Sequence, residues 1–114
     1  EIHHKRKIDS PSGTALSLAE IILEEVARKK FVNAETLHGK SKESELNVSS
    51  VRGGEVTGTH TLYIDSSADT IELTHRAKNR EGFALGALEA ARWIWNKKGM
   101  YDFISVFSEI LVKQ

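Results

Sequence analysis

The chain has 114 residues and a mass of 12.7 kDa, which is the size of one domain. Its 16 Lys and Arg residues balance 16 Asp and Glu residues, and this balance argues against a dedicated nucleic-acid-binding protein, which is usually strongly basic. The chain contains no cysteine, so disulfides, thiolate catalysis and Cys-ligated zinc are excluded. No apolar run approaches the ~18 residues of a membrane span and no signal-peptide pattern opens the chain, so we expect a cytoplasmic protein with no membrane partner.

The first predicted elements are a strand and a long helix. Residues 1–4 are predicted to form the end of a strand. The helix is predicted over residues 15–30, with Ser10 or Ser12 as its cap and the intervening proline at its first position. Its apolar side chains recur at helical spacing: Ala15, Leu18, Ala19, Ile22 and Val26. The cations of residues 28–30 are predicted in its last turn, where the helix dipole favours them.

A polar loop over residues 33–45 separates this helix from three extended runs. The runs cover residues 46–52, 56–65 and 70–77. Their spacing is typical of antiparallel strands. In the last two runs, aliphatic and histidine side chains alternate with threonine and charged ones, which predicts one buried face and one polar face.

Two more helices complete the predicted fold. The first covers residues 82–97 and is stopped by Gly99, and a short helix covers residues 103–112. The order β-α-β-β-β-α predicts an α+β fold, a mostly antiparallel or mixed four-stranded sheet with two helices on one face. No repeat or linker interrupts the chain, so we expect a single domain over residues 1–114. Because the chemically richest stretch starts at Glu1 and chain ends fray, we expect this domain to be the C-terminal part of a longer protein.

The strongest candidate for a binding site lies between the first strand and the first helix. Consecutive positions hold the titratable and cationic side chains: His3, His4, Lys5, Arg6 and Lys7. The first helical turn offers free backbone N–H groups at Ser12, Gly13 and Thr14. The helix dipole adds positive potential at the same place, Gly13 lets a ligand approach the backbone, and Thr14 offers a hydroxyl. The combination predicts a site for a carboxylate or a phosphate.

Each part of this pattern also has an ordinary structural explanation. The cations of residues 5–7 alone are typical of a solvated surface, and the serine, glycine and threonine that follow are typical of a plain helix cap. His60 and His75 lie on the apolar faces of their predicted strands, which is typical of core histidines with a hydrogen-bond partner. Because His3 and His4 would point to opposite faces of a strand and no H-x-x-x-H spacing occurs, we expect no metal site.

Together, these residues resemble the motifs of a known enzyme family. The first and longest stretch is Glu1-x-His3-His4-x-x-Lys7-x-Asp9-x-Pro11-Ser12-Gly13-Thr14-Ala15. The supporting stretches are Val51-Arg52-Gly53-Gly54-Glu55-Val56-x-Gly58-x-His60-Thr61 and Glu72-Leu73-Thr74-His75-Arg76-Ala77-x-x-Arg80-x-x-Phe83-Ala84-x-Gly86-Ala87. In order and spacing they resemble dihydrodipicolinate reductase, also called 4-hydroxy-tetrahydrodipicolinate reductase. The resemblance covers essentially the whole chain.

The resemblance implies an oxidoreductase of lysine and diaminopimelate biosynthesis. Such an enzyme reduces 4-hydroxy-tetrahydrodipicolinate to tetrahydrodipicolinate with NADH or NADPH. By position, His3 resembles the family's proton donor or acceptor and Lys7 its catalytic proton donor. The residues that resemble its substrate-binding residues are His4, Gly13 and Thr14, with Ser12 beside them. The implied partner is a small cyclic dicarboxylate, and the implied assembly is a homotetramer formed through this domain.

The chain matches only the C-terminal half of the family's pattern. Members carry an N-terminal Rossmann domain whose G-x-G-x-x-G loop binds the nucleotide, and that spacing does not occur here. We therefore expect a substrate-binding and tetramerisation domain that binds no cofactor and is inactive by itself. The loop over residues 37–47 is shorter than in the family, and Thr59 stands where the family has glutamate. The alternative is a non-catalytic anion-binding or assembly module of the same fold.

Overall fold

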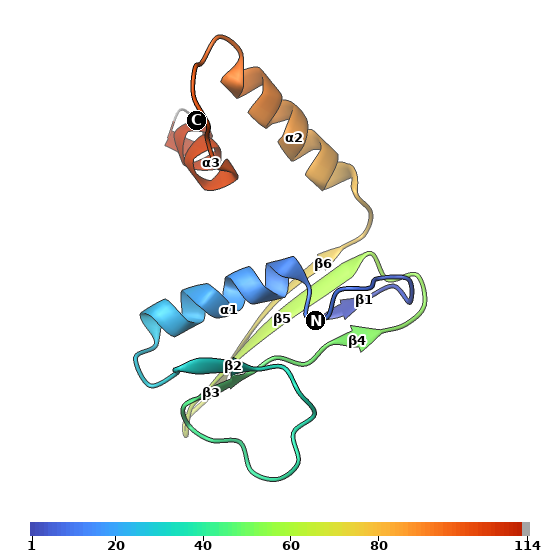
Figure 1. Cartoon of the computed structure of the whole chain (residues 1–114), viewed down its shortest axis with the longest axis vertical. Helices are drawn as coiled ribbons and strands as arrows, with labels where there is room; N and C mark the ends of the chain where they lie inside the picture. Colours follow the sequence, from blue (N-terminus) through green and yellow to red (C-terminus); the bar gives the residue numbers. More distant parts are fainter. Residues whose placement is uncertain (113–114) are drawn as a thin grey trace. The chain divides into compact units, whose positions relative to one another are not determined.

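The computed structural model describes residues 1–112 and divides the chain into two compact units (Figure 1). The first unit runs from Glu1 to Lys78, and the second begins at Asn79. The first unit holds one helix and all the strands, and the second holds two helices. This content confirms the predicted α+β class. Within the described residues, no helix has the length and apolar character needed to cross a membrane.

The main sheet of the first unit is mixed and has four strands. They are β1 (Ile2–His3), β4 (Val51–Arg52), β5 (Gly58–Asp65) and β6 (Thr70–Ala77), in the spatial order β4-β1-β5-β6. β1 pairs in parallel with β4 and antiparallel with β5, and β5 pairs antiparallel with β6. β1 therefore lies between β4 and β5, so the turn at Gly53 and Gly54 does not join neighbouring strands of a hairpin.

Helix α1 (Gly13–Glu25) begins two residues earlier than predicted and ends five residues earlier. Ser12 is its N-cap: it has an extended backbone, and its hydroxyl accepts a hydrogen bond from the backbone N–H of Ala15 at 3.2 Å. The proline therefore precedes the cap instead of occupying the first helical position. The cations of residues 28–30 lie beyond the helix, so their predicted place in its last turn is wrong.

The helix ends early because the chain turns there to form a second, two-stranded sheet. β2 (Phe31–Asn33) pairs in parallel with β3 (Glu45–Asn47), and the backbone N–H of Lys30 donates to the carbonyl oxygen of Ser44 at 2.8 Å. The sequence predicted only a loop over residues 33–45 and one strand over residues 46–52. The structure corrects both, since strands of two or three residues are too short to show an alternating pattern.

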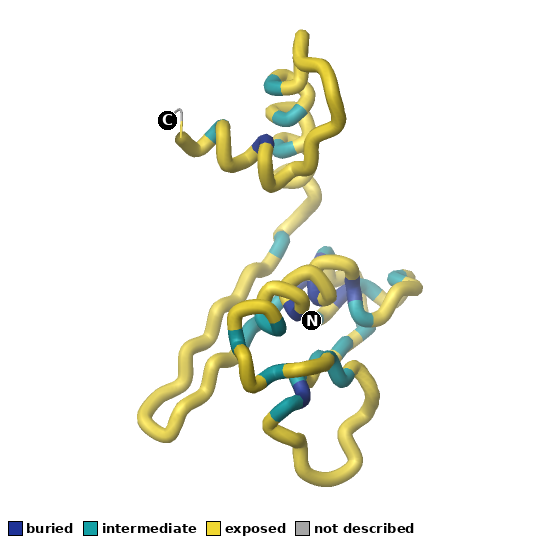
Figure 2. The backbone as a smooth tube through the Cα atoms, turned by 60° about the vertical axis from the view of Figure 1, so that its left-hand side comes forward, coloured by how far each residue is buried: buried dark blue, intermediate teal, exposed yellow. Residues whose placement is uncertain are grey.

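The long hairpin of β5 and β6 has nearly the predicted bounds, but burial does not alternate along its strands, and Thr59 of the predicted polar face is buried. Its aliphatic face is not buried along its whole length, however, because Ile64, Ile71 and Leu73 are each about half exposed within this chain (48%, 52% and 57%). The outer part of the hairpin is exposed in Figure 2. His75, which pairs with His60 away from the hairpin turn, is exposed within this chain, whereas His60 is half-buried, so the predicted core position of His75 depends on what covers this face. The predicted covering of this face by a second helix stays a prediction.

The second unit consists of α2 (Glu81–Ile94) and α3 (Phe103–Val112). The bounds of α3 are those predicted. α2 ends before Trp95, and Asn96 takes a positive φ of 66°, so the helix stops earlier than the predicted stop at Gly99. Lys97 joins the two helices. Its ammonium lies 3.2 Å from the ring centre of Trp93 on α2 and bonds the carboxylate of Glu109 on α3.

Candidate functional site

His3 is held in the middle of the sheet by its position on β1. The strand lies between β4 and β5, and the parallel register with β4 places Arg52 beside His3. His3 is only 8% exposed, and its ring packs edge-on against that of His60 with 5.0 Å between the ring centres. His4 follows at the end of the strand and is half-buried. Its Nδ1 atom is buried without a hydrogen-bond partner among the described residues.

The carboxylate of Glu1 joins His3 to Arg52. His3 Nδ1 bonds one oxygen of Glu1, and Arg52 Nη2 donates to the other at 2.7 Å. The side chain of Glu1 is 2% exposed. Burial alone would raise the pKa of Glu1, but hydrogen bonds to the carboxylate, with that from Arg52 the largest, and the charge of Arg52 outweigh burial and lower the pKa to about 2. Glu1 is therefore ionised at neutral pH and accepts both hydrogen bonds.

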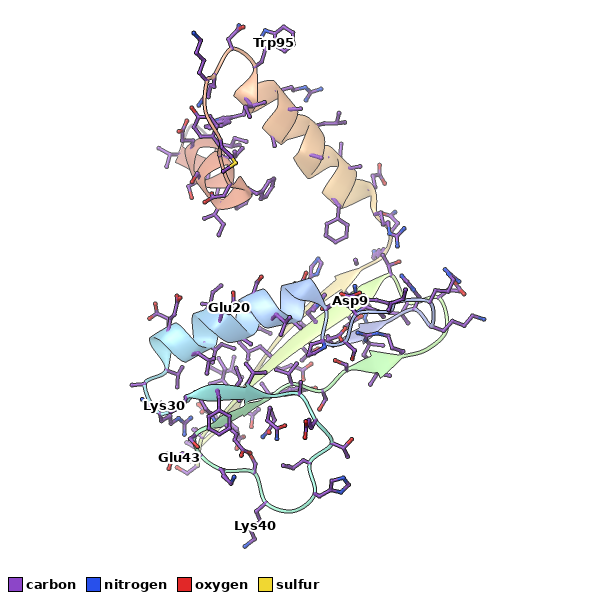
Figure 3. All side chains as sticks on the ribbon, in the orientation of Figure 1. Asp9, Glu20, Lys30, Lys40, Glu43 and Trp95 are labelled. Atoms are coloured by element: carbon purple, nitrogen blue, oxygen red, sulfur yellow. The ribbon has the colours of Figure 1, made fainter. Side chains whose placement is uncertain are left out.

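Lys7 belongs to the segment between β1 and α1. Its ammonium donates to Asp9 Oδ1 at 2.8 Å, and this bond lowers the pKa of the Asp9 carboxyl. Arg52 Nη2 donates to the backbone carbonyl of Asp9 at 2.7 Å. Figure 3 shows Asp9 near the start of α1. One network of hydrogen bonds thus links Lys7, through Asp9, Arg52 and Glu1, to His3.

The start of α1 supplies the remaining predicted residues. Ser12 is 2% exposed, and its hydroxyl lies 3.1 Å from Nε2 of His60 in addition to capping the helix. The predicted contact of Ser12 with substrate therefore has to come from its backbone, since its side chain is already engaged. Gly13 and Thr14 are exposed, and their backbone N–H groups have no partner within the described residues.

His60 connects the helix start to the strand that carries His3. Burial, followed by the charge of His3, lowers the pKa of His60, so the ring stays neutral at physiological pH. The sequence correctly predicted a histidine with a hydrogen-bond partner here. It did not single out Glu1 or Arg52, although Glu1 precedes His3 by two residues and therefore shares its face of the strand.

Glu1, His3 and His60 place three potential metal-ligating atoms within 4.8 Å of one another. The oxygens of Glu1 already accept hydrogen bonds from His3 and Arg52. A divalent cation bound there would lie next to the guanidinium of Arg52 and would have to displace the bond to His3. The residues thus fit a hydrogen-bonded cluster better than a metal centre.

A cavity of about 100 Å³ lies between α1 and the strands β3 and β5. It is mostly apolar and is lined by residues such as Leu18, Ile22 and Leu62, with Glu1 and His60 also lining it. None of the predicted site residues lines this cavity. They lie instead on the segment from His3 to Thr14, where Lys7, Gly13 and Thr14 are accessible from outside.

Comparison with protein families gives a match over residues 1–107 to the model described as "Dihydrodipicolinate reductase, C-terminus". The chain belongs to this family. The dihydrodipicolinate reductase resemblance seen in the sequence motifs is therefore confirmed, and the match extends from Glu1 into α3.

Curated relatives and a solved structure agree with the family. The chain is 48% identical over 107 residues to the 4-hydroxy-tetrahydrodipicolinate reductase of Aquifex aeolicus, covering 93% of this chain and 40% of that protein. It is 49% identical over 113 residues to the enzyme of that name from Archaeoglobus fulgidus, covering 91% and 44%. It is also similar to dipicolinate-bound dihydrodipicolinate reductase from Paenisporosarcina sp. TG-14, with 29% identity and a TM-score of 0.57 over 76% of this chain and 35% of that one. The chain thus spans less than half the length of these dihydrodipicolinate reductases.

Proposed function

We propose that this chain is the substrate-binding part of a 4-hydroxy-tetrahydrodipicolinate reductase, acting in lysine and diaminopimelate biosynthesis in the cytoplasm. The observation that carries the proposal is the network joining His3 and Lys7 beside the start of α1, in a chain that belongs to this family. The dipicolinate bound by the solved relative supports a cyclic dicarboxylate as the ligand.

The first turn of α1 suits a substrate carboxylate. The backbone N–H groups of Gly13 and Thr14 are unpaired within the described residues, and the helix dipole favours an anion at that end. Lys7 supplies a cation from the preceding segment, with its side chain 21% exposed. Nδ1 of His4 is buried without a hydrogen-bond partner in the described part of the chain, which leaves it available to a ligand group. These groups support the assignment of His4, Ser12, Gly13 and Thr14 to substrate binding, Ser12 through its backbone.

Reduction of an unsaturated ring adds a hydride and a proton. His3 and Lys7 are the proposed proton donors, because both can hold and release a proton beside the ring. The residues present do not fit the nucleotide that supplies the hydride. Gly53 and Gly54 lead through a turn toward β5 and not to a helix N-terminus, so they do not make a phosphate-binding loop. We propose that a Rossmann domain outside this sequence binds NADH or NADPH, and that the chain alone is inactive.

Titration calorimetry with pyridine-2,6-dicarboxylate tests the ligand site. We expect weak binding by this chain, since no second domain closes over the ligand. The double variant Lys7→Ala, Thr14→Ala is expected to lose the heat of binding. The matched control Lys40→Ala, Thr36→Ala removes the same residue types from the loop between β2 and β3, whose far end carries Lys40 (Figure 3), and should bind normally. No heat at millimolar ligand, or equal heat from both double variants, would contradict the site.

The coding sequence upstream of Glu1 separates the enzyme from the alternative. A strand, a G-x-G-x-x-G loop and a helix in that order support a reductase with its own nucleotide-binding domain. A start codon directly before Glu1 would favour the non-catalytic anion-binding or assembly module.

A further inference from the structure

We propose that Glu1 is the positioning residue of His3: it holds the proton of the neutral ring on Nδ1 and leaves Nε2 as the nitrogen that exchanges a proton with the substrate. This inference rests on the proposed function, because it assumes that His3 transfers a proton. It adds Glu1, which touches no substrate in this scheme, and it specifies which nitrogen of His3 reacts.

The hydrogen bond between Glu1 and His3 has only one possible direction. A carboxylate can only accept hydrogen bonds, and Glu1 is held in the carboxylate form by Arg52. His3 Nδ1 must therefore be the donor in its bond to Glu1. In the neutral ring this leaves Nε2 without a proton, so Nε2 takes up a proton from water and, as imidazolium, passes that proton to the substrate and returns to the neutral form.

The other ring nitrogen of His3 has different surroundings. Nε2 of His3 has no hydrogen-bond partner in the described part of the chain, and it faces the backbone of Gly58 on β5. A Cβ atom at position 58 would lie 3.0 Å from Nε2. The absence of a side chain at position 58 therefore leaves the ring of His3 room beside β5. The ring of His60 packs edge-on against His3, and its Nε2 is bonded to Ser12.

Arg52 fixes the orientation of the side chain at position 1. A guanidinium only donates hydrogen bonds, so it always needs an acceptor at the oxygen of Glu1 that it contacts. If Glu1 were glutamine, its single amide oxygen would turn toward Arg52. Its NH₂ group would then face His3 Nδ1, which would have to become an acceptor. The substitution Glu1→Gln thus keeps the shape of the site and moves the ring proton from Nδ1 to Nε2.

Nitrogen NMR of the chain labelled with ¹⁵N-histidine reads this proton directly. The chain is expressed with residues before position 1, so that position 1 carries an ordinary peptide bond, and the His3 signals are assigned by their loss in His3→Gln. At a pH where the ring is neutral, we expect a protonated Nδ1 in the unmodified chain and a protonated Nε2 in Glu1→Gln. The matched control is Glu45→Gln, another buried carboxylate paired with a cation, which should leave the His3 signals unchanged. An Nε2 proton in the unmodified chain, or an Nδ1 proton in Glu1→Gln, would overturn the proposal.

Kinetics of the reductase that contains this chain distinguish proton transfer by His3 from the positioning role of Glu1. His3→Gln is expected to lower kcat by about 10²–10⁴-fold, the usual contribution of an acid–base group. Glu1→Gln is expected to lower kcat by a similar factor with little change in KM, as the wrong tautomer does in other enzymes. A normal kcat in His3→Gln contradicts the proposed function of His3, while the NMR result still tests Glu1. A loss of kcat in His3→Gln with a normal kcat in Glu1→Gln contradicts the positioning role alone.

Discussion

Gly58 lies on β5 against the ring of His3. A Cβ atom at this position would come within 3.0 Å of His3 Nε2 and 3.3 Å of its Cδ2. The ring cannot easily retreat, because Glu1 holds its opposite edge and the residue is buried. The space left by this glycine is therefore part of the site even though the residue has no functional group.

We expect Gly58→Ala to displace His3 and to lower the free energy of unfolding by about 1–3 kcal/mol, the usual cost of overpacking. Urea unfolding of the chain measures this loss, and the ring shift should appear in the His3 NMR signals. Gly53→Ala is the matched control, because a Cβ there meets no atom within 4 Å and the backbone is not left-handed. Equal stabilities and unchanged His3 signals in both variants would show that the ring has room to move.

The low pKa of Glu1 makes a pH prediction. Its pKa falls from the ordinary 4.5 to about 2 in the folded chain, so the unfolded chain binds the proton more readily. The resulting stabilisation is fully present above pH 4.5 and is lost as the pH falls toward 2. We expect up to about 3 kcal/mol of stability to disappear over this range relative to Glu1→Gln. Unfolding curves at a series of pH values check it, and parallel losses in the two proteins would contradict it.

At the scale of residues, the sequence proposed the groups of the candidate site but not the residues that bond them. His3, His4, Lys7 and the glycine and threonine of α1 are all part of one continuous motif. The partners Arg52 and His60 come from β4 and β5, and only the register of the sheet brings them close. That register depends on β1 lying between β4 and β5, an arrangement that no local spacing predicts.

At the scale of elements, the start of α1 depends on Ser12. Its hydroxyl accepts from the N–H of Ala15 and also bonds His60, so it joins the helix to the sheet. We expect Ser12→Ala to lower the free energy of unfolding by about 1–2 kcal/mol, since it removes a cap and leaves a half-buried imidazole nitrogen unpaired. Ser17→Ala is the control: this serine is exposed within the same helix, and its loss should be neutral or slightly stabilising. Melting temperatures of both variants measure the difference.

The elements found from the sequence are those with long regular patterns. The alternation of β5 and β6 and the helical spacing of α1, α2 and α3 extend over at least eight residues each. The pair β2 and β3 was missed because each strand has three residues. Helix ends were misplaced where tertiary pairing decided them, as at the turn from α1 into β2.

At the scale of the whole molecule, the polar face of the β5–β6 hairpin is the proposed interface of a homotetramer. The threonines Thr61 and Thr74 bond each other across the strands at 3.0 Å, and Tyr63 is 65% exposed. Threonine and tyrosine pair well across strands, so such a face can pack against another sheet with its polar groups satisfied. The opposite, aliphatic face is also partly exposed within this chain, so the two faces have to be distinguished by experiment.

Light scattering at micromolar concentration tests the assembly. We expect a tetramer for the unmodified chain and dissociation in Thr61→Lys and Tyr63→Glu, because each puts a charge on the polar face. Leu73→Lys places a positive charge, as in Thr61→Lys, on the aliphatic face and is expected to leave the contact through the polar face intact. A monomer whose mass does not change in any variant would show that the polar face is only solvated. Dissociation by Leu73→Lys alone would assign the contact to the aliphatic face.

Every proposed functional group of this site lies between His3 and Thr14, but that segment does not organise itself. An excised peptide of residues 1–14 would contain each of these groups and would lack Arg52 and His60, which bond Glu1 and Ser12. Without Arg52 and His60 the carboxylate of Glu1 would be solvated, and neither the tautomer of His3 nor the start of α1 would be fixed. Grafting this site onto another scaffold therefore means transplanting two short pieces of sheet along with the motif, and the motif alone would be an inert, flexible peptide.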